Sequence, residues 1–358
     1  MRRFIALPVA IAALTSCSAP PPAVVEPVEL TFASWVFISP EQQAFMDDVE
    51  ETSGGTIAFA PIENWTEPDG VEKLGDEFTM AQAIIDGEID AGWTSTRSFP
   101  AIGIDGFRAI EAPFVIQNPA GLEEIISGPI GEAALAAFDG SGLTPLSIYP
   151  GTLRFPLTAG HPLLEPADWA GKEILYYAPT EDSVQARTVQ ALGGTPVATG
   201  LHIIDDLNDD LYGGGADSLG DIAADGATAR GPYPTSNVIL WPTVLFSVIN
   251  TAKFESLHDS QRAALTAAAQ RAAEAVATVE PSQSLAGPVC STSARFGTST
   301  PGQLAALRDA VRPVYDWLED DPAEAALLSD LQDIANAHPD PDIVNVPDGC
   351  AWDPAVQG

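Results

Sequence analysis

Few residues in this 358-residue sequence lie at a spacing that supports catalysis. The nearest pattern to a nucleophile is residues 216–220 (ADSLG), a relaxed form of the G-x-S-x-G turn that exposes a serine for attack. Such a serine needs a histidine base, and the only histidines after this turn are His258 and His338, both at expected helix ends. The sequence has no H-E-x-x-H, no G-x-x-x-x-G-K-[ST] and no G-x-G-x-x-G after an expected strand. We therefore expect no enzyme activity and no cofactor.

Metal binding also lacks a motif. Residues 205–210 (DDLNDD) are rich in oxygen ligands, but they lack the glycine and the terminal glutamate of an EF-hand loop, so we expect a solvated acidic loop. The four histidines are scattered, and none lies at ligand spacing from a cysteine. We expect no metal site.

The first segment of the chain indicates export. Residues 4–14 (FIALPVAIAAL) follow two arginines and form an apolar run of signal-peptide length, too short to span a bilayer. The following residues 14–17 (LTSC) resemble the lipobox of bacterial lipoproteins, in which the cysteine receives a lipid and becomes the first residue. Residues 18–29 have the composition of a Pro-rich tether. We expect a signal peptide over 1–16 and a lipidated Cys17 with its tether over 17–29; an ordinary signal peptide is the alternative.

The two other cysteines form an even pair in an oxidising compartment. We expect a disulfide between Cys290 and Cys350, which would fasten residues 344–358 to the body of the protein. Two separate buried thiols are the alternative.

Charge excludes two classes of partner. The chain has 15 Lys and Arg against 50 Asp and Glu, a formal net charge of −35. Nucleic acid and anionic membrane surfaces would repel it, so we expect contact with a membrane through the lipid anchor only.

The first third of the body alternates strand and helix patterns. Strands are expected over 30–35, 56–60 and 89–94, and a helix over 40–51 with Ser39 and Gln42 as a capping box. A second helix is expected over 78–86. This order predicts an α/β fold with a largely parallel sheet and helices on both faces.

The remainder adds a second sheet region and a helical end. Strands are expected over 143–149, 173–177 and 195–198. Helices are expected over 183–192, 259–279 and 322–337, and another, capped by Thr300, presents an apolar face from Leu304 to Leu318.

Several short fragments, in this order, resemble the solute-binding proteins of tripartite ATP-independent periplasmic (TRAP) transporters. The resemblance spans residues 30–280 and rests on 53–55 (SGG), 86–90 (DGEID), 112–114 (APF), 151–154 (GTLR), 166–172 (PADWAGK), 191–197 (ALGGTPV), 216–217 (AD) and 248–262 (VINTAKFESLHDSQR).

This resemblance implies a two-lobed periplasmic-binding-protein-like α/β fold with crossing strands, a long domain-spanning helix and a helical C-terminal third. Lobe I would comprise 30–151 plus about 240–256, and lobe II 152–239 plus about 257–358, which takes in the C-terminal helices. A ligand cleft between the lobes would close by hinge motion.

The resemblance also indicates site residues. The main carboxylate-binding arginine of the family falls on Leu175 here, so this chain departs from the pattern. Arg154 matches the other pocket arginine and is the candidate for an anionic group of the ligand, with a structural salt bridge as the alternative. Arg97 would lie at the mouth of the cleft, Asp217 in the short acidic turn, and Asp221 near a family asparagine position.

Five aromatic residues complete the candidate ligand site, with ordinary core packing as the alternative for each. They are Trp35, Trp93, Tyr176, Tyr177 and Trp241.

The function implied is capture of a small organic solute outside the cytoplasm and its delivery to the integral membrane permease subunits of a TRAP-type transporter. Leu175 and the net charge favour a neutral, zwitterionic or singly acidic ligand with an apolar or aromatic part over a dicarboxylate. A surface ligand sensor or adhesion lipoprotein of the same fold is the alternative.

Overall fold

The structure is a computed structural model that describes residues 25–35, 37–65, 76–177, 180, 182–199, 203–208, 212–225, 232–276 and 278–357. The signal segment, Cys17 and most of the tether lie outside the described residues, as do residues 209 and 210 of the acidic segment 205–210. The expected loop is wrong for residues 205–208 of this segment, which lie in the helix α7 (Ile203–Asn208). Within the described part of the chain, no helix is long and apolar enough to cross a bilayer.

A mixed seven-stranded sheet forms the centre of the molecule, in the order β2-β1-β3-β9-β4-β7, with β8 paired to β4. A separate parallel pair, β5-β6, lies beside it. The strands are β1 (Val28–Ala33), β2 (Ile57–Ile62), β3 (Ala91–Ser95), β4 (Leu143–Thr158), β5 (Glu173–Tyr176), β6 (Thr195–Ala198), β7 (Gly215–Asp217), β8 (Tyr233–Pro234) and β9 (Trp241–Asn250).

Strand direction differs in part from the expected parallel sheet. β1 pairs in parallel with β2 and β3, as the alternation of strand and helix predicts. β9 is antiparallel to both β3 and β4, and β4 is antiparallel to β7 and β8. Because β9 lies more than 80 residues after β4 in the chain, no crossover helix constrains its direction.

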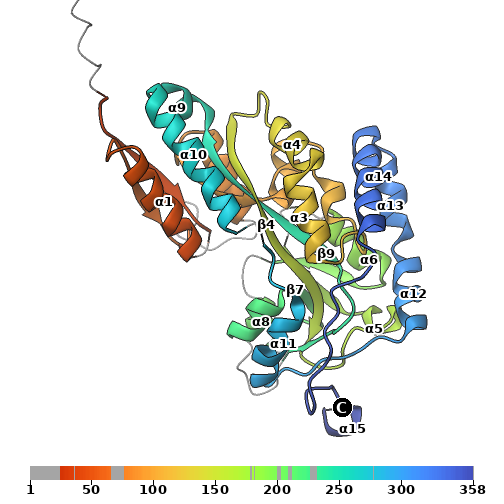
Figure 1. Ribbon diagram of the computed structural model, residues 1–358. Coiled ribbons are helices and arrows are strands. Elements are labelled where there is room, and N and C mark those ends of the chain that lie inside the picture. Colours follow the sequence, from red (N-terminus) through yellow and green to blue (C-terminus); the bar gives the residue numbers. More distant parts are fainter. Residues whose placement is uncertain are drawn as a thin grey trace, which may run out of the picture.

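Two long strands run lengthwise through the molecule (Figure 1). β4 extends 16 residues rather than the expected seven, and it pairs with β9 from Leu143 to Arg154 before it pairs with β7 and β8. The register shifts between Pro150 and Leu153, at a bulge. Gly151 in this bulge allows β9 to approach, because a Cβ there would lie 2.6 Å from the carbonyl oxygen of Thr243.

Helices cover both sides of the sheet. Figure 1 shows α1, α9 and α10 at one end of the crossing strands and α8 and α11 at the other. The helices are α1 (Pro40–Thr52), α2 (Asp76–Ile85), α3 (Pro119–Ser127), α4 (Pro129–Ala136), α5 (Pro166–Trp169), α6 (Val184–Ala191), α7 (Ile203–Asn208), α8 (Leu219–Asp225), α9 (Thr251–Ser256), α10 (Asp259–Ala275), α11 (Ser282–Ser291), α12 (Pro301–Ala310), α13 (Arg312–Glu319), α14 (Pro322–Ala337) and α15 (Pro354–Gln357), with 3-10 helices η1 (Thr96–Ser98), η2 (Pro100–Ile102) and η3 (Arg108–Glu111).

Local capping signals predicted helix starts well. Ser39 and Gln42 form the expected capping box, with reciprocal bonds of 2.9 and 3.3 Å, and Thr300 caps α12 in the same way. The single helix expected through Leu318 is wrong: it breaks at Val311 into α12 and α13. Pro313 explains the break, since it has no backbone N–H to continue the helical hydrogen bonds.

The C-terminal tail is fastened to the body. Cys290 of α11 and Cys350 form the expected disulfide, with their Cα atoms 5.7 Å apart. The backbone of Phe296 also bonds on both sides of Ala351, which adds a short strand-like contact.

Candidate functional site

A stack of cationic and aromatic side chains lies where several strands end. The guanidinium of Arg97 lies over the rings of Trp35 and Tyr177, at 5.6 and 5.2 Å from their centroids. Arg154 lies over Tyr177 as well, at 5.7 Å, so this ring contacts both guanidinium groups. Trp35 follows β1, Arg97 follows β3 in η1, Tyr177 follows β5, and Arg154 lies in the crossing strand β4.

Arg97 is held by a carboxylate that the sequence did not single out. Its Nη2 and Nε lie 2.8 and 2.9 Å from Oε2 of Glu77 in α2, and the two side chains are 5% and 7% exposed. The other oxygen of Glu77 accepts the backbone N–H of Ser95 and the hydroxyl of Thr94. Glu77 thus fixes Arg97 at the end of β3.

Arg154 meets two carboxylates. Its Nη1 donates to Oδ1 of Asp217, at the end of β7, and lies 3.3 Å from Oδ2 of Asp221 in α8. Its Nε donates to the hydroxyl of Thr243 at 3.2 Å. The structure therefore brings together Arg154, Asp217 and Asp221, three of the residues that the sequence indicated.

Ser218, the residue of the relaxed nucleophile pattern, positions this acidic pair. Its hydroxyl donates to Oδ2 of Asp221 at 2.7 Å, and its backbone N–H donates to Oδ1 of Asp217 at 2.8 Å. The described histidines bond elsewhere: His161 to Pro162, His258 to Ser260 and His338 to Glu124. Ser218 thus serves as a turn residue and has no histidine base among the described residues.

The pKa values of the two aspartates are shifted in opposite directions. Burial raises the pKa of Asp217 to about 7, with repulsion from Asp221 adding to the shift and the charge of Arg154 opposing it. Desolvation acts to raise the pKa of Asp221 too, but Arg154 and the hydrogen bonds outweigh it and hold that pKa below its usual value. Burial also raises the pKa of Tyr177, so its hydroxyl, 3.5 Å from Oδ2 of Asp217, is a neutral donor.

A buried chain of hydrogen bonds joins Tyr177 to a third carboxyl group. The backbone N–H of Tyr177 donates to Gln185 in α6 at 3.1 Å, and the Gln185 amide donates to Oε2 of Glu111 at 2.9 Å. Thr96 is 3.4 Å from the other oxygen of Glu111. Burial raises the pKa of Glu111, against the attraction of Arg97. Glu111 and Gln185 belong to no motif that singled them out in the sequence; the only signal is that Glu111 directly precedes the APF fragment.

A cavity of about 220 Å³ opens beside this chain. It lies between the segment of η1, η2 and η3 and residues at the start of α6. Its lining includes Thr96, Arg97, Pro100, Ala101, Phe107, Arg108, Glu111, Thr180, Asp182, Ser183 and Val184.

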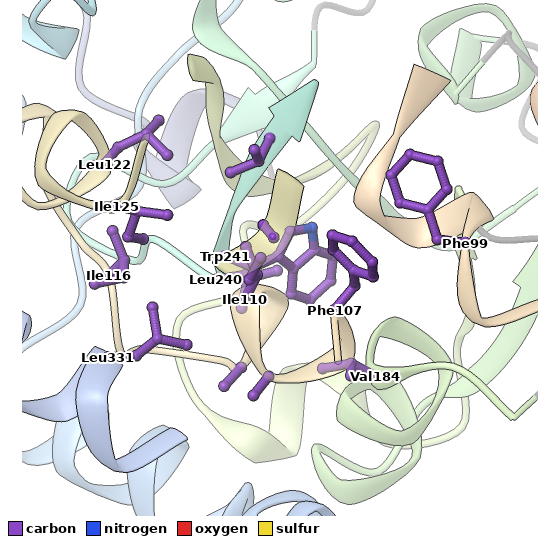
Figure 2. Packing of buried hydrophobic residues seen from close by; sticks show 14 of the residues in the cluster. Phe99, Phe107, Ile110, Ile116, Leu122, Ile125, Val184, Leu240, Trp241 and Leu331 are labelled. Atoms are coloured by element: carbon purple, nitrogen blue, oxygen red, sulfur yellow. The ribbon is translucent and has the colours of Figure 1, made fainter. Parts of the chain in front are cut away.

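Three of the five aromatic residues that the sequence indicated lie in packed cores, which agrees with the alternative of ordinary core packing. Trp93 stacks on Tyr149 with ring centroids 4.5 Å apart, and Tyr176 is buried with its hydroxyl 3.3 Å from the carbonyl of Thr180. Trp241 is buried beside Phe107 (Figure 2). Leu175 is also buried, in a different apolar cluster.

Residues 39–201 match the family described as DctP, bacterial extracellular solute-binding protein, family 7. A curated protein from Sinorhizobium fredii, named uncharacterized protein y4mM, is 26% identical over 124 residues, or 35% of this chain. That match spans 22% of the relative's own length.

Solved structures share the fold over nearly their whole length. The sugar acid binding protein of Advenella mimigardefordensis, in complex with galactonate, is similar with a TM-score of 0.75 and 17% identity, over 88% of this chain and 99% of that one. A TRAP periplasmic solute-binding protein from Ralstonia eutropha, with bound (S)-2-acetolactate, has a TM-score of 0.75 and 19% identity, over 86% and 99%. A TRAP periplasmic solute-binding protein from Shewanella oneidensis, with bound succinate, has a TM-score of 0.72 and 18% identity, over 87% of this chain and 99% of that one. The expected fold, α/β and two-lobed, is confirmed by this likeness.

Proposed function

We propose that this chain, whose residues 39–201 match the family 7 extracellular solute-binding proteins and whose fold is that of TRAP periplasmic solute-binding proteins, captures a small organic solute and delivers it to a TRAP-type membrane permease. Capture is by closure of two lobes, without a chemical step. Lobe I comprises 30–151 plus about 240–256, and lobe II comprises 152–239 plus about 257–358.

The observation that carries this proposal is the stack around Tyr177. In the proposed division, Trp35 and Arg97 belong to lobe I, and Tyr177 and Asp217 belong to lobe II. Arg154 also belongs to lobe II, on the part of β4 just beyond the boundary between the lobes. The rings and guanidinium groups are 5.2 to 5.7 Å apart. Contacts of this kind between two lobes form only when the cleft closes, so a ligand that adds to them shifts the protein toward its closed form.

Both arginines contribute to ligand binding in this proposal, together with Trp35, Tyr177, Asp217 and Asp221. Each guanidinium already pairs with a carboxylate, and Leu175 provides no further cation. A dicarboxylate would bring two more negative charges to this cluster, so it is a poor ligand. A neutral, zwitterionic or singly acidic solute fits better.

The mature protein is held outside the cytoplasm by a lipid on Cys17. The Pro-rich tether, which ends where β1 begins at Val28, gives the body reach toward its permease.

A thermal-shift screen tests this function. The probes are organic acids, amino acids, sugars, polyols and aromatic acids, and the protein is the full chain with Cys17→Ser. A ligand at about 100 times its Kd stabilises the native state by roughly 2.7 kcal/mol. We expect Arg154→Ala to abolish the shift of any hit, because Arg154 contacts both aspartates and the ring of Tyr177, and that ring also contacts Arg97 in the lining of the cavity.

The matched control is Arg271→Ala, which removes a surface ion pair between Arg271 on α10 and Asp48 on α1. It should leave the shift unchanged. A screen with no hit, or a hit that Arg154→Ala retains in full, contradicts the proposed site.

A further inference from the structure

We propose that Glu111 binds the ammonium group of an amino-acid-like zwitterion in the cavity between η1–η3 and α6, with Arg97 facing the carboxylate of the same ligand. This inference rests on the proposed function and names the class of solute.

The charges around Tyr177 do not balance among the described residues. The site contains two guanidinium groups, those of Arg97 and Arg154. It contains four carboxyl groups, those of Glu77, Glu111, Asp217 and Asp221. Glu77 forms an ion pair with Arg97, and both aspartates form ion pairs with Arg154. Glu111 is the member of this set that no lysine or arginine of the described chain contacts within ion-pair distance.

Glu111 is also the buried carboxyl group in the lining of the cavity. Its side chain accepts hydrogen bonds from Gln185 and Thr96, which are neutral donors, and it is 4% exposed. Among the charged groups that act on it, Arg97 and Arg154 attract it and Glu77 repels it. A buried carboxylate without a cationic partner is unfavourable, so either a proton or a cationic ligand group neutralises it. A ligand ammonium supplies both the charge and the N–H donors.

Arg97 lies in the same lining and has donors to spare. A guanidinium has five N–H groups, and the bonds of Arg97 to Glu77 use two of them. A ligand carboxylate can take others, while Pro100, Phe107 and Val184 offer an apolar wall. A zwitterion thus adds no net charge to a cluster that already has an excess of carboxyl groups. The net charge of −35 also disfavours dianions, because it repels them as they approach the protein.

Calorimetric titration with matched probe pairs tests this. Each pair shares a carbon skeleton and differs in the 2-amino or 2-hydroxy group: leucine and 2-hydroxy-4-methylpentanoate, phenylalanine and 3-phenyllactate, valine and 2-hydroxy-3-methylbutanoate. For at least one pair, we expect the full chain with Cys17→Ser to bind the amino member about tenfold more tightly or better. In Glu111→Gln, the preference should fall toward one.

The ratio of affinities within a pair is the readout, since general loosening of the cavity would weaken both members alike. Glu132→Gln, on the exposed side of α4, is the matched control for loss of one negative charge and should keep the ratio. If Glu111→Gln fails to fold, the ratio of affinities measured with the protein that keeps Glu111 still tests the preference for a zwitterion.

Tighter binding of the hydroxy members overturns the zwitterion but leaves the solute-binding function intact. An amino preference that Glu111→Gln retains overturns the role of Glu111. Failure of every probe in these pairs overturns this inference, whereas the wider thermal-shift screen decides the proposed function separately.

Discussion

At the scale of single residues, the site is built from carboxyl groups whose protonation depends on their neighbours. Asp217 and Asp221 share one guanidinium, and their pKa values move in opposite directions. Asp217 is almost fully buried at the end of β7, whereas the side chain of Asp221 is 54% exposed. Two carboxylates close to one cation do not both ionise at their usual pH, so the pair retains a proton near neutrality.

This arrangement predicts a pH-dependent stability that Asp217→Asn changes. The folded-state pKa of Asp217 is raised to about 7, so between about pH 4 and 7 the folded state holds a proton that the unfolded state releases. The contribution of Asp217 to the free energy of unfolding is therefore full below about pH 4 and is lost as the pH rises toward 7. A difference of one bound proton changes the free energy of unfolding by at most about 1.4 kcal/mol per pH unit.

Chemical denaturation at several pH values measures this slope. Asp217→Asn should show a smaller decline between about pH 4 and 7 than the wild type, because it removes the contribution of Asp217 and leaves that of Glu111. Asp139→Asn, on the exposed surface, should keep the decline of the wild type. Equal slopes in the wild type and Asp217→Asn would contradict the raised pKa.

At the scale of elements, the crossing strands β4 and β9 position the site. Arg154 lies on β4 just after the bulge, and Thr243, which bonds it, lies on β9. The close approach of the two strands at Gly151 sets where both side chains lie. The geometry of the bulge therefore decides whether Arg154 reaches Asp217.

Gly151→Ala should destabilise the protein and disturb this register. A Cβ at residue 151 would lie 2.6 Å from the carbonyl oxygen of Thr243, and relief of such a clash costs about 1–3 kcal/mol. Gly160→Ala is the matched control, because a Cβ there meets no atom within 4 Å. Urea unfolding compares the two, and equal free energies of unfolding for both variants would refute the steric argument.

At the scale of the whole molecule, the proposed function requires that the body be attached to a membrane. The described part contains no helix that could cross a bilayer. The C-terminal tail is held to the body by the disulfide of Cys290 and Cys350. The proposed function assigns attachment to a membrane to a lipid on Cys17.

Cys17→Ser should release the protein from the membrane. A lipid anchor contributes about 0.8 kcal/mol for each buried CH₂ group, and the net charge of −35 offers no attraction to anionic lipid that could replace it. Cell fractionation followed by immunoblotting compares the wild type with Cys17→Ser, and Cys290→Ser is a control for loss of a cysteine. A wild-type protein found only in the soluble fraction would show that Cys17 carries no lipid.

The sequence by itself determined the features that depend on near neighbours or on simple counting. Capping boxes at Ser39 and Thr300, the starts of most helices and the first strands follow from residues within one or two turns. The disulfide followed from cysteine parity and compartment, because only Cys290 and Cys350 were left to pair.

Only the tertiary structure decided the length of β4, the antiparallel direction of β9 and the partners of the charged residues. In a chain with 50 acidic residues, an arginine has many possible partners, and their choice depends on contacts between distant segments. Arg97 meets Glu77 because α2 packs on β3, and Gln185 reaches Glu111 across 74 residues of chain. Such pairings leave no local periodicity in the sequence, so the roles of Glu77 and Glu111 emerge only from the fold.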